Sequence, residues 1–454
     1  MKKVITYGSF DLFHEGHYRL LQRAKQLGDY LIVGVTTEQY DESRGKMNVI
    51  DSLMERIDHV KQTGFADEII IEDHVGQKLE DILRYHVDIF TVGSDWTGTF
   101  DYLSDYCEVV YLERTKDISS TMLRAKNFPI ARLGIIGTGR IARRFVPEVK
   151  YISGVYVEGV FNPHIESAKK FAKRFELKFS TDDLNEFFEN VDAVYIASPH
   201  GTHYDYAKAA LMAGKHVLCE KPICLKGWEA KALFELAKVK NCVLLEAIKT
   251  AYAPGFNQML SLAKSGIIGN IRDVESCFTR LTSPALREMC DEKNGGSFTE
   301  LGSYTLLAII KLLGVDYESV HFESFFAENG VDIYTKAYFR YEKSLATSKT
   351  GLGVKSEGQL IISGTRGYIK VEAPWWKTQS FEVCYEDFNQ NETHFVKFRG
   401  EGLRYEISDF VSLMNGYGKS EYKLTAEESI ALATLMEKYL QERKKMRQAD
   451  EGAK

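Results

Sequence analysis

Two glycine-containing turns, each between an apolar strand and a helix, mark the start of two similar stretches of this chain. The first turn, GSFDLFHEGH (8–17), follows the apolar run KVITY, and the second, GTGRIA (137–142), follows RLGII. After each turn along the chain, apolar strand-like runs alternate with amphipathic helical segments. Because parallel strands need helical crossovers, this alternation predicts two doubly wound α/β sheets.

A third region has a different pattern. From about residue 251, long strand-like runs appear, namely VESCFTRL, AYFRYEKSLATSKTG, GQLIIS, YIKVEA and FEVCYED. They predict a large mixed or antiparallel sheet with one open face, followed by helices around 404–416 and 425–445 and a frayed tail. At roughly 150 residues per folding unit, 454 residues suggest three units. We expect domains at 1–127, 130–250 and 251–446.

Composition narrows the function classes. Charged residues make up 27% and hydrophobic residues 44%, as is usual for soluble globular proteins. The net charge of -6 argues against a general nucleic-acid binder, although a local basic pocket could still hold a small anion. The seven cysteines are scattered without a CxxC pair, and neither a signal peptide nor an apolar run of membrane-spanning length is found. These features predict a cytoplasmic enzyme that acts on small molecules, without nucleic-acid or membrane partners.

The first turn places His14 and His17 beside a predicted helix N-terminus, at the carboxyl end of a strand. Ligands of open α/β sheets bind at that edge, and helix N-termini attract phosphate. Imidazole N–H groups could stabilise charge that develops on a phosphoryl group, and Gly16 leaves room for it. Two nearby histidines can also be purely structural, or bind a metal, although no third ligand stands out.

The surrounding motifs resemble those of the cytidylyltransferase family, and most closely the glycerol-3-phosphate cytidylyltransferases. The family pattern Gly-x-Phe-Asp-x-x-His-x-Gly-His is matched by GSFDLFHEGH, and its Arg-Thr-x-x-Ile-Ser-Thr pattern is approximated by RTKDISST (114–121). Asp95 and Trp96 match a further family segment, so the resemblance covers residues 1 to about 126. It implies a Rossmann-like nucleotidyltransferase domain.

The resemblance also implies a reaction, in which a polyol phosphate attacks the α-phosphate of CTP and pyrophosphate leaves. His14 and His17 would stabilise the phosphoryl charge, and Mg²⁺ would accompany CTP. Arg114 would hold phosphate oxygens, as would Lys46, whose flanking sequence is less distinctive. The other nucleotide-binding residues implied are Gly8, Phe10, Asp11, Ser119 and Thr121.

The second turn carries the spacing G-x-G-x-x-A, through Gly137, Gly139 and Ala142. With a strand before it and a helix after it, this spacing is typical of a dinucleotide-binding Rossmann fold, although a plain glycine turn can share it. Asn162 ends the second strand, where NAD enzymes place a carboxylate that binds the ribose. An uncharged Asn favours NADP and leaves NAD open; His164, Lys169 and Lys170 could assist.

Residues 131 to about 445 resemble the glucose-fructose oxidoreductase and inositol dehydrogenase family (Gfo/Idh/MocA). The motifs are ASPHGTH (197–203), CEKP (219–222) and GGSFTELGSY (295–304). The resemblance implies hydride transfer between a nicotinamide and a carbinol or carbonyl carbon, with a C-terminal α+β substrate domain.

The same resemblance assigns roles to individual residues. Tyr304 would pass the proton, while Lys221 would polarise the oxygen and lower the pKa of the tyrosine. Pro199 and His203 would border the nicotinamide, and Glu220 belongs to the Glu-Lys-Pro signature. Family members often carry Asp at the position of Glu300, so we leave Glu300 without a catalytic role.

Together the two halves predict a bifunctional enzyme whose two reactions are consecutive. A keto sugar or its phosphate would be reduced to a polyol phosphate and then activated as a CDP-alcohol for a teichoic-acid-like or capsular polymer. In one alternative, the oxidoreductase half only binds NAD(P) and regulates the transferase. In another, the transferase half is inactive and serves oligomerisation. A homo-oligomer is expected, because the open sheet could pair with a second copy.

Overall fold

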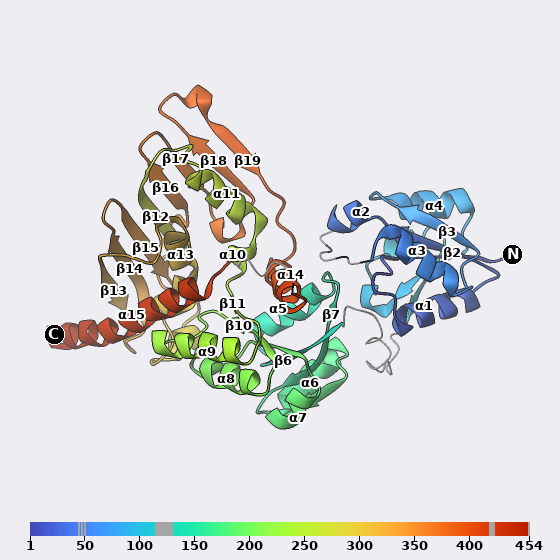
Figure 1. Cartoon of the computed structure of the whole chain (residues 1–454), viewed down its shortest axis with the longest axis horizontal. Helices are drawn as coiled ribbons and strands as arrows, with labels where there is room; N and C mark the ends of the chain where they lie inside the picture. Colours follow the sequence, from blue (N-terminus) through green and yellow to red (C-terminus); the bar gives the residue numbers. More distant parts are fainter. Residues whose placement is uncertain (44–45, 47–48, 50, 114–129, 417–422, 453–454) are drawn as a thin grey trace. The chain divides into compact units, whose positions relative to one another are not determined.

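The computed structural model describes residues 1–43, 46, 49, 51–113, 130–416 and 423–452. The chain forms two compact units, which are considered separately below (Figure 1). The first comprises 1–132 with 147–156, and the second comprises 133–146 with 157–454.

The first unit contains a five-stranded parallel sheet of order β3-β2-β1-β4-β5, drawn in blue in Figure 1. Its strands are β1 (Lys3–Gly8), β2 (Tyr30–Thr36), β3 (Glu68–Glu72), β4 (Ile89–Gly93) and β5 (Glu108–Leu112). Its helices are α1 (Glu15–Gln26), α2 (Glu38–Ser43), α3 (Leu53–Gln62) and α4 (Gln77–Tyr85). The central strands β1 and β2 are buried along nearly their whole length because helices cover both faces. The first histidine motif follows the carboxyl end of β1.

The second unit begins with a six-stranded sheet of order β11-β10-β9-β6-β7-β8. Its strands are β6 (Ala131–Ile136), β7 (Val155–Phe161), β8 (Phe179–Thr181), β9 (Ala193–Ile196), β10 (His216–Glu220) and β11 (Leu244–Ala247). Its helices are α5 (Arg140–Val149), α6 (Ile165–Phe175), α7 (Leu184–Glu189), α8 (His203–Met212) and α9 (Gly227–Val239). The glycine turn joins β6 to α5, and the CEKP motif lies at the carboxyl end of β10, on the same edge of the sheet.

An eight-stranded mixed sheet follows, of order β13-β14-β15-β12-β16-β17-β18-β19. Its strands are β12 (Ile271–Thr279), β13 (Ser319–Phe326), β14 (Asp332–Arg340), β15 (Leu345–Gly351), β16 (Leu360–Gly364), β17 (Tyr368–Val371), β18 (Ser380–Cys384) and β19 (Glu392–Phe395). The accompanying helices are α10 (Lys249–Tyr252), α11 (Pro254–Lys264), α12 (Arg287–Cys290), α13 (Ser297–Leu313), α14 (Leu403–Met414) and α15 (Ala426–Gly452). Helix α13 packs against β12, β14 and β15. Exposed and buried residues alternate along β13, so one face of this strand is open.

The predicted fold class is confirmed, with two local differences. The run 337–351 is not one strand but the end of β14, a turn, and β15, which pair antiparallel. The expected frayed tail is helical, because α15 continues to Gly452. Across the described ranges, no helix combines the length and the apolar character that crossing a bilayer requires.

Candidate active sites

His14 forms the N-terminal cap of α1. Its Nδ1 accepts hydrogen bonds from the backbone N–H groups of Gly16, at 3.0 Å, and of His17, at 3.4 Å. An accepting Nδ1 in a neutral imidazole puts the ring proton on Nε2. The cap therefore leaves His14 with one N–H donor, directed away from its own helix.

His17 stacks on His14, with 3.8 Å between ring centroids and 17° between ring planes. Burial lowers the pKa of His17 well below its ordinary value, and the charges of His14 and Lys46 add to the effect. Its Nδ1 is buried and has no hydrogen-bond partner among the described residues. The two rings are therefore held close, and an anionic ligand would be expected to raise the pKa of His17.

The turn before the histidines has an unusual backbone. Phe10 and Leu12 adopt positive φ angles, 52° and 46°, which non-glycine residues rarely do outside functional or otherwise constrained sites. Leu12 N donates to Asp51 Oδ2 at 2.9 Å, and Asp51 N donates to Asp11 Oδ1 at 2.8 Å. These bonds hold the strained turn in place.

Three of the predicted nucleotide-binding residues support this turn. Phe10 is only 1% exposed and packs against His17, with centroids 5.5 Å apart. Gly8 faces the Phe10 ring so closely that a Cβ atom there would lie 3.0 Å from it. Asp11 is buried as well. The buried side chains of Phe10 and Asp11, and the absence of a side chain at Gly8, therefore shape the turn.

Two cations contact the same turn. Lys46 Nζ donates to Ser9 Oγ, which brings its charge to the end of β1. Arg56, on α3, is fully buried and donates to the carbonyls of Ser9 at 2.9 Å, Thr36 at 2.7 Å and Asp51 at 3.0 Å. Arg56 thus ties together the ends of β1 and β2.

The sequence interpretation missed Arg56. Its only signal was an arginine beside Ile57 and Val60, on the buried side of a short helix. The predicted residues Arg114, Ser119 and Thr121 lie outside the residues that the structure describes.

In the second unit, Gly137 makes the sharp turn from β6 to α5. Its φ is 103°, and a Cβ atom would lie 2.5 Å from the Ala197 carbonyl oxygen, so a side chain is excluded. Gly139 has open space around it, with no atom closer than 4.0 Å to a Cβ placed there. Ala142 is completely buried under the first turn of the helix. This geometry fits a dinucleotide whose pyrophosphate approaches the backbone.

Asn162 is joined to the glycine turn at the end of β7. Its Nδ2 donates to Thr138 Oγ1 at 3.1 Å, and its Oδ1 accepts from His164 N at 2.9 Å. Arg143, one turn into α5, donates through Nε to the Thr138 carbonyl at 3.3 Å. A neutral amide and a guanidinium therefore flank Thr138.

Lys221 and Tyr304 come together as expected. Lys221 Nζ donates to the backbone carbonyl of Glu300 at 2.8 Å and lies 3.8 Å from its Oε2. The same Nζ lies 5.7 Å from the centroid of the Tyr304 ring. Because Glu300 and Tyr304 are one turn apart on α13, this helix aligns the lysine with the tyrosine.

The pKa of Tyr304 differs from expectation. Burial raises it well above its ordinary value, and the charges of Glu220, Glu406 and Glu300 raise it further, against an opposing effect of Arg280. The expected lowering by Lys221 is wrong for this structure, because burial and three carboxylates dominate. A tyrosine kept protonated is suited to donate a proton.

Glu300 is the centre of a charged cluster that the sequence did not reveal. Its carboxylate lies 3.7 Å from His200 Nε2, 3.7 Å from Arg280 and 3.9 Å from Arg140. Burial lowers the pKa of His200 well below its ordinary value, and Lys221 lowers it further. His200 is therefore a neutral hydrogen-bonding group at neutral pH.

The remaining predicted residues lie behind this cluster. His203 is completely buried, and its ring nitrogens face the carbonyls of Pro222, at 2.8 Å, and Ser198, at 3.0 Å. Glu220 is also buried and accepts a 2.6 Å hydrogen bond from the Tyr195 hydroxyl. Pro199 directly precedes the 3-10 turn that carries His200. Through these contacts, His203 and Glu220 stabilise the backbone that surrounds His200 and Lys221.

Known protein families match both units. Residues 5–126 match the family described as cytidylyltransferase-like. Residues 131–247 match the oxidoreductase family with an NAD-binding Rossmann fold, and residues 256–370 match the GFO/IDH/MocA C-terminal domain.

Individual proteins are similar to one part of the chain or the other. Glycerol-3-phosphate cytidylyltransferase of Bacillus subtilis (strain 168) is 48% identical over 124 residues, which are 27% of this chain and 95% of that protein. The scyllo-inositol 2-dehydrogenase (NADP(+)) of the same strain is 28% identical over 319 residues, 67% of this chain and 95% of that protein.

A solved structure shares the fold of the second unit. The 3-ketoreductase of Actinomadura kijaniata, in complex with TDP-benzene and NADP, superimposes with a TM-score of 0.59 at 24% identity, over 67% of this chain and 95% of that one. The chain thus belongs to the cytidylyltransferase-like family through its N-terminal domain, which is fused to oxidoreductase domains of the GFO/IDH/MocA family.

Proposed function

We propose that the chain catalyses two consecutive reactions: NADP-dependent reduction of a keto sugar phosphate, and cytidylyl transfer from CTP to the polyol phosphate so formed. Domain 1–127 would carry the transfer, 130–250 would bind the dinucleotide, and 251–446 would shape the carbonyl site. A CDP-alcohol from such a pair would serve as the activated precursor of a teichoic-acid-like or capsular polymer.

The observation that carries the proposal is that each unit, taken by itself, brings its own predicted reactive groups together: His14 stacks on His17 in one, and Lys221 lies beside the Tyr304 ring in the other. In the transferase, a phosphate oxygen of the polyol phosphate would attack the α-phosphorus of CTP while the bond from that phosphorus to pyrophosphate breaks, so that a CDP-alcohol forms. The Nε2–H of His14 and the ring of His17 would stabilise the phosphoryl oxygens. Lys46, together with Arg114 of the predicted motif, would hold the triphosphate.

Mg²⁺ is proposed to arrive with CTP. Among the described residues, no group of three or more His, Cys, Asp or Glu could hold a metal ion. In phosphoryl-transfer sites, Mg²⁺ is held mainly by substrate phosphates, water and one or two carboxylates. Asp11, in the turn that precedes His14, is a candidate carboxylate for this role.

In the oxidoreductase, bound NAD(P)H would supply the hydride. Tyr304 would give its hydroxyl proton to the carbonyl oxygen as the alcohol forms, and Lys221 would orient that oxygen. Asn162 supports NADP over NAD, because no carboxylate stands at this position to repel a 2′-phosphate. Arg143, close to Thr138, provides a positive charge on the same side.

A pyrophosphate-release assay tests the pair of reactions. The protein would be incubated with CTP, Mg²⁺ and a panel of polyol phosphates, and separately with the matching ketose phosphates with or without NADPH. Release from a ketose phosphate only when NADPH is present supports consecutive steps. If polyol phosphates react but no ketose phosphate does, the transferase stands and the coupling fails.

Recording NADPH absorbance together with pyrophosphate release in these incubations decides between the alternatives. An oxidoreductase half that only binds NAD(P) would show no steady NADPH oxidation with any ketose. An inactive transferase half would release no pyrophosphate with any polyol phosphate. Retention of Lys221 with Tyr304, and of His14 with His17, argues against both.

A further inference from the structure

A small pocket, partly open to solvent, lies next to the predicted catalytic groups of the oxidoreductase. Its charged and polar lining comprises His200, Arg287, Glu288, Asp291, Asn294 and Glu300. Glu300 lines the pocket and lies 3.8 Å from Lys221 Nζ, so the pocket adjoins the predicted catalytic lysine. The charges of this lining therefore bear on which substrate the site accepts.

Cations on neighbouring elements compensate the two glutamates. Glu288 lies 2.9 Å from Arg280 and 3.6 Å from Arg140. Glu300 lies near the same two arginines and near Lys221. Two carboxylates thus share three cations, and this cluster carries no net negative charge.

Asp291 is engaged by the backbone. Its Oδ1 accepts hydrogen bonds from the N–H groups of Lys293, at 3.1 Å, and Asn294, at 2.9 Å. Backbone N–H donors stabilise the negative charge of a carboxylate. Asp291 therefore serves to close the turn that forms one wall of the pocket.

Arg287 differs from the other cations. Its side chain is exposed at the pocket, and within the described ranges it has no ion pair or side-chain hydrogen bond. Its charge contributes to lowering the pKa values of both His200 and His203, which places the guanidinium charge on their side of the pocket. The guanidinium of Arg287 is permanently charged and can therefore bind an anionic group of a ligand.

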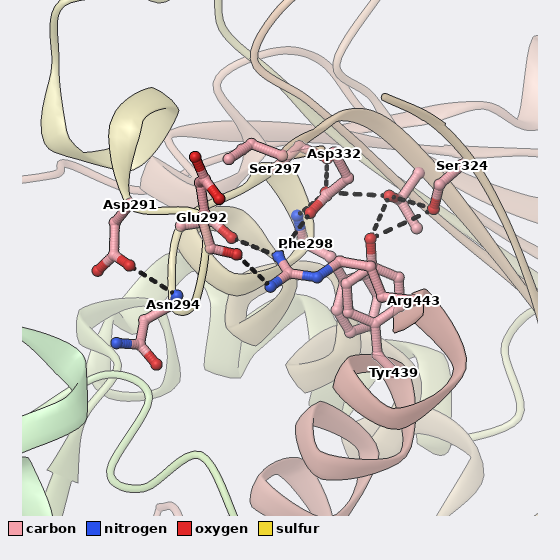
Figure 2. A network of polar contacts seen from close by, with 12 residues as sticks. Asp291, Glu292, Asn294, Ser297, Phe298, Ser324, Asp332, Tyr439 and Arg443 are labelled. Atoms are coloured by element: carbon pink, nitrogen blue, oxygen red, sulfur yellow. Dashed lines mark hydrogen bonds and ion pairs between the residues drawn. The ribbon is translucent and has the colours of Figure 1, made fainter. Parts of the chain in front are cut away.

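A network of polar contacts around Arg443 holds the loop that lines the pocket (Figure 2). Arg443 of α15 donates to the carbonyls of Gly295 at 2.8 Å, Lys293 at 2.8 Å and Glu292 at 3.0 Å. It also lies 3.5 Å from Asp332 Oδ1.

The same network holds the start of α13. Asp332 Oδ2 accepts from Ser297 Oγ at 2.8 Å and from Phe298 N at 2.9 Å. The loop 291–296 and the first turn of α13 are therefore positioned before a ligand binds, which reduces the ordering cost of binding.

We propose that Arg287 binds the phosphate group of a phosphorylated hydroxyketone while Lys221 and Tyr304 act on its carbonyl. Arginine suits this role because its planar guanidinium can donate two parallel hydrogen bonds to phosphate oxygens. The assignment rests on the proposed reductase function and deepens it, because it makes the phosphate a requirement of the first reaction as well as of the second.

The test uses matched pairs of substrates, dihydroxyacetone with its phosphate and ribulose with its 5-phosphate, in NADPH oxidation by the full chain. For the preferred ketose phosphate, Arg287→Gln should raise KM about 10- to 100-fold, the usual range for loss of a charged hydrogen bond. The unphosphorylated ketose should be unaffected by the substitution. Lys293→Gln removes an exposed charge from the adjacent loop and should match the wild type. Equal KM values of the wild type for both forms of a ketose would overturn the inference while leaving the reductase function intact.

A binding measurement keeps the two hypotheses separable. With NADP⁺ present, inorganic phosphate should raise the melting temperature of the wild type and of Lys293→Gln more than that of Arg287→Gln. If no ketose oxidises NADPH but this difference is found, the reductase proposal fails and the phosphate site stands. If all three proteins respond equally to phosphate, the phosphate site is refuted.

Discussion

The two candidate active sites follow the same architectural rule but are built in different ways. Each lies where a central parallel strand ends and a helix begins, after β1 in one unit and after β6 in the other. At the first, histidines from one contiguous motif provide the reactive groups, and His14 caps its own helix. At the second, the turn supplies a sharp bend at Gly137 and open space at Gly139, and the reactive groups come from the residue after β10 and from α13.

This difference matters for what each site can recognise. The first site concentrates imidazoles and Lys46 at one turn, which suits the compact charge of a triphosphate. The second collects three arginines, a lysine and two glutamates from distant segments, which suits a substrate that combines a carbonyl, hydroxyl groups and a charged end. The comparison teaches that a single-turn site is set by local backbone geometry, whereas a multi-segment site depends on packing between elements.

The largest expected effect is on the single-turn site. His14→Asn keeps a side chain that can cap α1 but removes the Nε2 donor, so cytidylyl transfer should fall about 10²- to 10³-fold. Pyrophosphate release measures the loss, and a circular dichroism spectrum like that of the wild type would show that α1 persists. Ketose reduction should be unchanged, since its groups belong to the other unit. A parallel loss of both activities would contradict the independence of the two sites.

The reciprocal change affects the multi-segment site. Tyr304→Phe should lower the rate of NADPH oxidation about 10²-fold or more, because the proton donor is lost, and should leave pyrophosphate release intact. In the wild type, the raised pKa of Tyr304 keeps its hydroxyl protonated, so the tyrosine should cause no loss of reductase rate up to about pH 10. A rate that falls already near pH 8 and is restored to a flat profile in Tyr304→Phe would show that Lys221 lowers this pKa after all.

The sequence predicted the first site more completely than the second, because sequence patterns report local structure and not contacts between distant segments. His14, His17 and the glycine turns lie in contiguous motifs, so the local pattern was sufficient to place them. Glu300 and His200 acquire their importance only when α13, β10 and the turn after β9 come together. Both residues lie within motifs that the sequence shows, ASPHGTH and GGSFTELGSY, but neither motif indicates that the two side chains meet.

The same limit applies to the fold. Strand and helix alternation identified both parallel sheets, because each element carries its own periodicity. The break between β14 and β15 was missed, since the turn YEKS lacks glycine and proline. The helical end of α15 was missed because a polar, charged segment has no apolar face to signal it.

A buried carboxylate makes the stability of the second unit depend on pH. Burial raises the pKa of Glu246 to about 7, and its Oε2 has no hydrogen-bond partner in the described part of the chain. In the unfolded chain this carboxyl ionises at about pH 4.5, whereas in the folded chain it stays protonated up to about pH 7. The free energy of unfolding therefore falls as the pH rises from about 4.5 to about 7, and it stays at the lower value above that. The loss amounts to about 3 kcal/mol at most.

Glu246→Gln tests this directly, because a glutamine oxygen can still accept the 3.0 Å hydrogen bond from Ile223 N. Its melting temperature should exceed that of the wild type by an amount that grows from pH 5 to pH 7.5, measured by calorimetry. Only the transition of the oxidoreductase unit should shift. A difference that is constant with pH would mean that Glu246 titrates normally.

The smallest expected effect concerns cofactor choice. Asn162→Asp places a carboxylate beside Thr138, where it would accept from the 2′-hydroxyl of NADH and repel the 2′-phosphate of NADPH. The ratio of Kd for NADPH to Kd for NADH should rise about 10-fold or more. Titration of nicotinamide fluorescence without substrate measures both constants.

Two further variants test whether a charge near Thr138, and not a charge anywhere on the surface, selects the cofactor. Arg143→Gln should weaken NADPH alone, because its charge pairs only with the 2′-phosphate, whereas Asn185→Asp, on the exposed surface of α7, should leave both constants unchanged. If Asn162→Asp and Arg143→Gln each change the two constants equally, these residues act on the shared pyrophosphate or on the turn itself. Cofactor choice would then be set by His164, Lys169 or Lys170, the groups that follow β7, and the glycine turn would provide space without selectivity.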